Sequence, residues 1–189
     1  MKNLAIVLAI AVVLGCSGMA IAQDKAPATN VPDILNHSLS SVESEFVPAA
    51  EAMPDDKFDF APAASSGEFK GVRTFAQQVK HVAAVNYMLG GSILGEKPPV
   101  DLKGENGPDT METKADAVKF LKDSFAYAHK ALSSINQDNI HGLVQIPWGP
   151  EKDTRAALAL IMLEHPWDHY GQMVEYLRMN GIVPPASRK

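Results

Sequence analysis

Two histidines four residues apart, His165 and His169, are the residues in this sequence best suited to chemistry. On a helix this spacing places both side chains on one face, one turn apart, so both imidazoles can reach a single metal ion. Both histidines also fall on an apolar stripe, where an unpartnered polar ring costs roughly 1–3 kcal/mol. The other members of this stripe are Leu158, Met162, Met173 and Tyr176. The pair therefore needs partners, which are either a metal ion or hydrogen bonds to neighbouring helices.

A third metal ligand would have to come from another helix, and His81 is the best candidate. It shares a helical face with Gln78, Val85 and Met88, beside the apolar stripe of its own segment. The other histidines are expected to have solvated or structural roles: His37, His129 and His141. Three neutral imidazoles leave a divalent ion at least one open position, which is typical of a catalytic site. Zinc and nickel are our first expectation, and iron and copper suit the same ligands.

Side chains close to the histidine pair in sequence are candidates to orient the rings. They are Gln172, Asp168, Glu164 and Glu175. Asp168 and Glu175 are more often solvated helix charges, so Gln172 is the first choice. Pro166 lies between the two histidines, lacks an N–H and clashes with the carbonyl group of Met162. Because the apolar stripe continues in phase on both sides, we expect a kink in this helix and not a break.

Four segments carry the helical spacing of apolar residues: 32–53, 70–94, 110–136 and 153–180. The third has apolar residues at alternating steps of three and four, which is the seam of a bundle helix. Pro48 interrupts the last turn of the first segment and could end that helix early. No segment shows the sustained alternation of a strand. The sequence therefore predicts an all-α protein, a four-helix bundle.

The connections between these helices are long and contain proline or glycine. They cover residues 53–69, 95–109 and 137–152. Antiparallel hairpin bundles use loops of about 2–8 residues, so these connections allow crossovers and parallel neighbouring helices.

The N-terminus has the pattern of a secretory signal peptide. Lys2 precedes an apolar run at residues 4–14, which is too short to cross a bilayer. We expect cleavage after Ala22, which leaves a mobile leader at 23–30, the bundle at 31–185 and a tail at 186–189. A lipoprotein anchored through Cys16 is the alternative. The protein is thus predicted to be exported, periplasmic or secreted, with no membrane span.

Charge and cysteine content exclude several classes of function. Seventeen basic and twenty-two acidic residues give a formal charge of −5, which disfavours nucleic-acid binding. Cys16 is the single cysteine, so a chain cleaved after Ala22 has none. Thiol catalysis, disulfides and cysteine-based zinc sites are then excluded for the mature protein.

A set of motifs carries a family resemblance. Residues 165–172 read His-Pro-Trp-Asp-His-Tyr-Gly-Gln, and a Tyr-Leu-Arg run leads from there to a Gly-x-x-Pro end at 181–184. His81 lies in the middle of the second predicted helix, and residues 53–58 read Met-Pro-Asp-Asp-Lys-Phe. Over residues 31–185 the chain resembles the DinB-like superfamily of four-helix metalloproteins.

This resemblance implies an up-down-down-up bundle and a divalent metal ion held by His81, His165 and His169. Characterised relatives transfer or isomerise with small thiols. Our leading hypothesis is an exported metal-dependent enzyme, a hydrolase or a thiol transferase, acting on an unidentified small molecule. The alternatives are a non-catalytic metal-binding or stress-associated protein and a purely structural bundle. The sequence leaves the oligomeric state open, a homodimer included.

Overall fold

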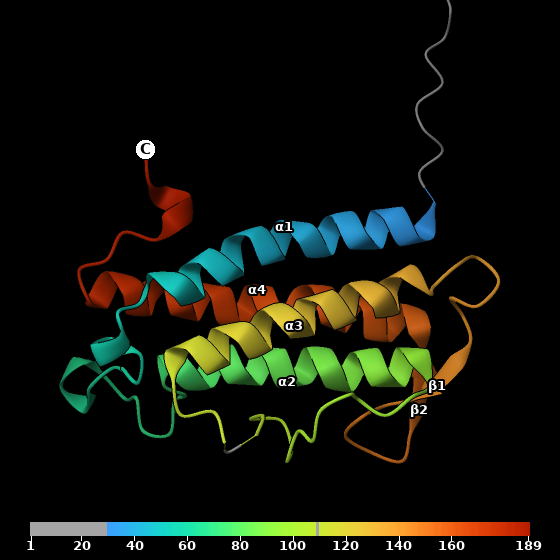
Figure 1. Ribbon diagram of the computed structural model, residues 1–189, viewed down its shortest axis with the longest axis horizontal. Coiled ribbons are helices and arrows are strands. Elements are labelled where there is room, and N and C mark those ends of the chain that lie inside the picture. The colour runs from blue at the N-terminus through green and yellow to red at the C-terminus, as the bar shows by residue number, and fades with distance from the viewer. Residues whose placement is uncertain (1–29, 109) are drawn as a thin grey trace, which may run out of the picture.

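The computed structural model describes residues 30–108 and 110–189, so the predicted signal peptide and most of the leader lie outside the described residues. Four helices make up most of the described chain: α1 (Val31–Ala52), α2 (Phe75–Leu94), α3 (Lys114–Ser133) and α4 (Arg155–Met179). They pack side by side as a bundle (Figure 1). The predicted four-helix, all-α architecture is confirmed.

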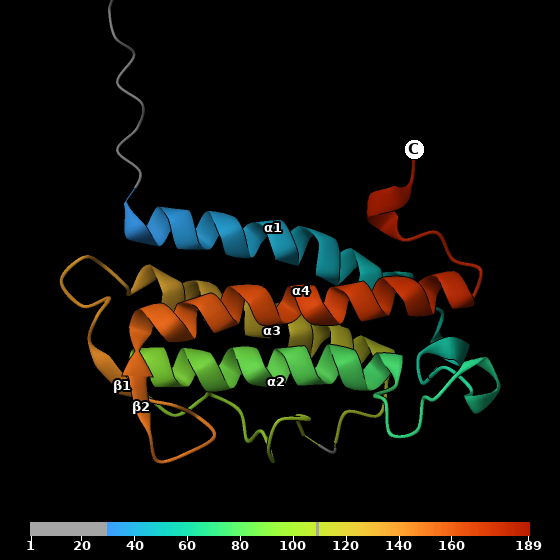
Figure 2. The ribbon, with the colours of Figure 1, turned by 180° about the vertical axis from the view of Figure 1, so that it is seen from behind.

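The four helices are arranged in two parallel pairs. Following the colours in Figure 1, α2 and α3 run in the same direction, and α1 and α4 run in the opposite one. Each parallel pair is in contact, and α1 also packs on α3, as α2 does on α4. From behind, α4 lies between α1 and α2 (Figure 2). This is the up-down-down-up order, and it requires the long 95–113 connection, which returns along α2 to the start of α3.

Side-chain caps decide where the helices begin. The predicted second helix starts at residue 70, but α2 begins only after Thr74. There the Thr74 hydroxyl accepts a hydrogen bond from the Gln77 N–H (3.2 Å), and the Gln77 Oε1 atom accepts one from the Thr74 N–H (2.8 Å). Similarly, Thr113 caps α3 and Thr154 caps α4. Such caps satisfy amide groups that have no partner within the helix.

Neither internal proline ends its helix. Pro48 does not end α1 early, because the helix continues from Pro48 to Ala52. α4 is continuous across Pro166. Pro166 is buried and Pro48 is partly buried, and packing against the neighbouring helices offsets the hydrogen bond that each proline removes.

The expectation that the chain contains no strand is wrong in one place. β1 (Leu143–Gln145) and β2 (Lys152–Thr154) form a short antiparallel hairpin just before α4, with Val144 paired to Asp153. Three residues are too few to show an alternating pattern, and β2 is polar. The strand signal therefore falls below what a periodicity analysis detects.

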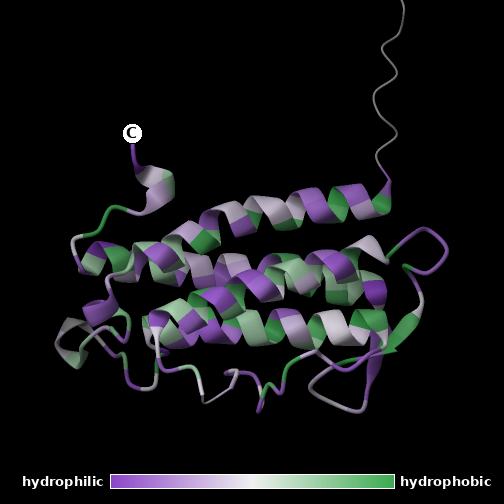
Figure 3. Cartoon of the chain, in the orientation of Figure 1, coloured by the Kyte–Doolittle hydropathy of each residue, from purple (hydrophilic) through white to green (hydrophobic). Residues whose placement is uncertain are grey.

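The core lies between the helices, which each carry both hydrophobic and hydrophilic residues (Figure 3). Phe46 of α1 and Phe125 of α3 are fully buried, with ring centroids 6.3 Å apart. Asn86 of α2 is also fully buried and donates a hydrogen bond to the Ser124 hydroxyl of α3 (3.3 Å). Within residues 30–108 and 110–189, no helix has the length and apolar character that crossing a membrane requires.

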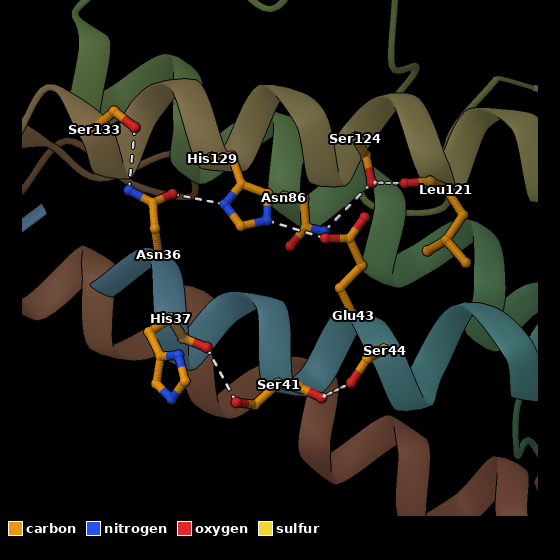
Figure 4. A network of polar contacts seen from close by, with 10 residues as sticks. All are labelled: Asn36, His37, Ser41, Glu43, Ser44, Asn86, Leu121, Ser124, His129 and Ser133. Atoms are coloured by element: carbon orange, nitrogen blue, oxygen red, sulfur yellow. Dashed lines mark hydrogen bonds and ion pairs between the residues drawn. The ribbon is translucent and has the colours of Figure 1, made fainter. Parts of the chain in front are cut away.

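A polar network joins α1 to α3 away from the predicted metal ligands (Figure 4). The two ring nitrogens of His129 lie 2.6 Å from Asn36 Oδ1 and 3.0 Å from Glu43 Oε2. Asn36 also donates a hydrogen bond to the Ser133 hydroxyl (3.1 Å). His129 therefore contributes to contacts between helices, which is the structural role expected for it.

Candidate metal centre

The three predicted ligands meet between two antiparallel neighbours, α2 and α4. His81 lies in the second turn of α2, and His165 and His169 lie in the middle of α4. Because α4 is unbroken at Pro166, the two α4 histidines keep the one-turn separation of an intact helix. Packing of α2 against α4 then brings the His81 ring to within 5.0 Å of the His165 ring, measured between centroids.

Two distances between the ring nitrogens are those of ligands that share one ion. The Nε2 atom of His165 lies 3.1 Å from Nε2 of His81 and 3.0 Å from Nε2 of His169. One donor atom from each of the three rings can be chosen so that all lie within 4.8 Å of one another. Two nitrogens about 2.0–2.1 Å from an ion are about 2.9–3.4 Å apart in octahedral or tetrahedral geometry.

A backbone carbonyl sets the proton position on His81. Its Nδ1 atom lies 2.7 Å from the Glu105 carbonyl oxygen, in the 95–113 connection. A carbonyl can only accept a hydrogen bond, so Nδ1 carries the proton. The Nε2 atom of the neutral ring then presents its lone pair to the other two histidines.

A chain of amides does the same for His169. The Asp168 carboxylate accepts from the Gln172 amide nitrogen (3.2 Å), and the Gln172 Oε1 atom accepts from the Gln78 amide nitrogen (2.8 Å). The Gln78 Oε1 atom is thereby left to accept from His169 Nδ1. Because a carboxylate only accepts, it fixes the direction of the whole chain. The Nδ1 atom of His169 therefore carries the proton, and its unprotonated Nε2 atom faces His165.

His165 lacks such a partner. Its Nδ1 atom is buried and has no hydrogen bond among the described residues. A proton on Nδ1 would leave three lone pairs converging with nothing between them. A proton on Nε2 would lie between the Nε2 lone pairs of His81 and His169 and would leave Nδ1 as an acceptor without a donor. A cation at the centre accepts all three lone pairs, so the donor set fits a divalent metal ion.

The electrostatics of the cluster keep the rings neutral. Burial, followed by the proximity of the other two histidines, lowers the pKa of His165 to about 3. Burial chiefly lowers the pKa of His169 to about 4, and it lowers the pKa of His81 as well. Neutral imidazole is the form that binds a metal ion. The cluster is therefore in its metal-binding form at neutral pH.

The metal-free protein is expected to lose stability as the pH falls from about 7 to about 5. In the unfolded chain these histidines take up protons near pH 6.5, whereas His165 and His169 resist protonation until much lower pH when folded. Below pH 6.5 the unfolded state therefore binds more protons, and the free energy of unfolding falls; at higher pH the two residues contribute no slope. Urea unfolding at several pH values measures this. An equally steep pH dependence in H165A would contradict the assignment.

Of the other predicted site residues, two are connected to the histidine cluster by hydrogen bonds and Glu164 is not. Gln172 and Asp168 belong to the hydrogen-bonded chain that ends on His169. Glu164 is exposed, and within the described parts of the chain no hydrogen bond or ion pair connects it to the histidines. On a helix its position next to His165 points its side chain away from the cluster.

Two residues that accept hydrogen bonds from the ligand rings, Gln78 and Glu105, were missed by the sequence analysis. Gln78 lies three residues before His81 on the same helical face, and it is buried. That spacing was a usable signal, because a buried amide on a ligand's face is a natural partner for another ligand. Glu105 contributes its main-chain carbonyl from a long connection, and every residue type has that group. No sequence pattern marks it.

Replacing Gln78 by leucine is expected to weaken divalent metal binding by about 10–100-fold, because His169 loses the acceptor that orients its ring. Q78E is the matched control: its carboxylate still accepts from Nδ1, so it should remain within severalfold of the wild type. Competition with a chromophoric chelator measures both affinities. Equal affinities for Q78L and the wild type would show that the amide chain does not support the site.

Comparisons with known proteins agree with this architecture. The family model described as the DinB superfamily matches residues 38–173, which include all three histidines. The crystal structure of a DinB-like protein from Bacillus subtilis superposes with a TM-score of 0.62 at 18% identity, covering 82% of this chain and 99% of the other. The crystal structure of a DinB-like protein from Bacillus cereus superposes with a TM-score of 0.61 at 12% identity, and the match covers 83% of this chain and 97% of the other.

At these identities the solved structures show the fold alone, and no curated protein matches the chain. The family match is broader: it covers most of the chain, from the second turn of α1 into the last turns of α4. Together with the up-down-down-up bundle, it confirms the resemblance seen in the motifs. The chain belongs to the DinB superfamily.

Proposed function

We propose that this protein is a divalent-metal-dependent enzyme that acts on a small molecule, with His81, His165 and His169 as the metal ligands. One observation carries the proposal. The Nε2 atoms of two of these rings, whose Nδ1 protons are held by acceptors, converge with that of a third at separations of 3.0 and 3.1 Å. A divalent ion at this point would accept the converging lone pairs.

The ligand set favours catalysis over structural stabilisation. Three neutral histidines leave an ion its full charge and at least one open position. An ion bound there would lower the pKa of a water or thiol, or polarise a carbonyl group. Since Cys16 is the single cysteine, a reacting thiol would have to belong to a small molecule. We therefore propose a hydrolase or a thiol transferase, with zinc or nickel ahead of iron and copper.

Turnover by metal-loaded protein tests the function. The protein is purified without added metal, its metal content is measured by elemental analysis, and it is reloaded with zinc, nickel, iron or copper. Model esters, amides and acceptors with a small thiol are then assayed. We expect activity that disappears in H165A while its circular dichroism stays helical. Equal activity in both proteins would reject the enzyme. Tight metal binding without turnover would instead favour a metal-binding protein that is not catalytic.

We also propose that the protein is exported and cleaved after Ala22. Residues 4–14 supply the apolar run, and Ala20 and Ala22 supply small residues before the cleavage site. The expected product in the periplasm or medium begins at Gln23, as measured by mass spectrometry, and C16S is processed in the same way. A lipid-modified chain beginning at Cys16 would favour the lipoprotein, and an uncleaved cytosolic chain would reject export.

A further inference from the structure

Arg73 is a cationic side chain beside the metal centre that the proposed chemistry does not use. It directly precedes Thr74, the cap of α2, and its Nη2 atom lies 3.3 Å from a carboxylate oxygen of Glu105. The carbonyl of the same Glu105 accepts from His81. The Tyr176 hydroxyl of α4 donates to the Arg73 carbonyl oxygen (3.1 Å). Both helices that carry ligands and the connection over α2 therefore hold Arg73 in place.

The charge of Arg73 lies close to the cluster. One residue, Glu105, contacts the Arg73 guanidinium with its carboxylate and the His81 ring with its main-chain carbonyl. The Glu105 carboxylate pairs with this guanidinium, and the Asp168 carboxylate accepts from Gln172. A divalent ion would add positive charge near Arg73, so an anionic ligand that contacts both would be attracted by two positive groups.

The contact between Arg73 and Glu105 is one that another carboxylate can replace. The two side chains are 34% and 60% exposed, and exposed ion pairs contribute little to stability. A guanidinium has five N–H donors, and two of them can bind the two oxygens of one carboxylate together. Within the described residues, its side chain makes one hydrogen bond, to Glu105. Donors therefore remain for a ligand even with Glu105 in place.

We propose that Arg73 binds a carboxylate of the substrate, whose reacting end faces the open position of the metal ion. The substrate class is then a small molecule with at least one carboxylate, held at two points. This inference rests on the proposed function, because it requires the ion. It makes Arg73 a residue that determines specificity, and it makes Glu105 the group that occupies Arg73 when substrate is absent.

Anion binding to the cobalt(II)-loaded protein tests the proposal, because the visible spectrum of cobalt reports on a new ligand. Acetate, with one carboxylate, is compared with malonate, succinate and glutarate. At least one dicarboxylate should bind about tenfold more tightly than acetate, as expected for one added charge-assisted contact. This preference should disappear in R73Q and remain in R178Q, which removes the same charge from the last turn of α4.

A further variant separates binding by Arg73 from a general loss of structure. E105Q keeps the main-chain carbonyl that His81 needs but removes the competing charge, so it should retain or strengthen the dicarboxylate preference. If cobalt binds normally and R73Q keeps the wild-type preference, or if the wild type has none, the proposal is overturned and the metal site stands. If the protein forms no cobalt complex, the proposed function fails and this inference fails with it.

Discussion

Replacing His169 by alanine is expected to weaken divalent metal binding by more than about 100-fold. Removing a partner that only orients a ligand already costs about 10–100-fold, and this variant removes the ligand itself. It also leaves Gln78 without the ring that its Oε1 atom accepts from. Isothermal titration of metal-free protein, or chelator competition where binding is tight, measures the change.

His129 provides the matched control for this experiment. It is a partly buried histidine whose ring nitrogens contact Asn36 and Glu43, in the network between α1 and α3 (Figure 4). H129A should therefore keep the wild-type metal affinity, although it loses contacts that stabilise the bundle. An H169A affinity within tenfold of the wild type, or an equal loss in H129A, would mean that the ion binds elsewhere.

Replacing Phe125 by alanine is expected to lower the free energy of unfolding by about 3–5 kcal/mol. The side chain is fully buried and packs against Phe46, which brings α3 onto α1. Truncation removes the ring contacts and leaves a cavity that the surrounding helices can only partly fill. A loss of this size is a large part of the roughly 5–15 kcal/mol that stabilises a typical domain. Urea unfolding monitored by circular dichroism measures it.

An exposed apolar residue is the control for that variant. The Ile34 side chain of α1 is 51% exposed, so I34A should change stability by no more than about 0.5 kcal/mol. F125A should also lower the melting temperature while the folded protein still binds metal, because the three ligands lie on α2 and α4. If F125A and I34A were equally stable, Phe125 could not lie in the core.

The helices could be predicted because their signal is local and repeated. Apolar residues at steps of three and four mark all four helices, and the long connections already allowed parallel neighbours. The starts of α2 and α3 lie five and four residues after the predicted ones, because single caps at Thr74 and Thr113 decide them. The hairpin of β1 and β2 was missed, because its strands are stabilised by pairing with each other and carry no pattern of their own.

For the candidate site, the sequence alone determined the relation between His165 and His169. Helix geometry sets the direction of two side chains one turn apart, wherever the helix lies. Only the tertiary structure decided that His81 meets them, because the rotation and axial position of α2 against α4 depend on how the whole core packs. It also decided the hydrogen bonds of Gln78 and of the Glu105 carbonyl, which join segments distant in the chain. Those contacts fix where the protons lie, and so turn three histidines into a site that fits a cation.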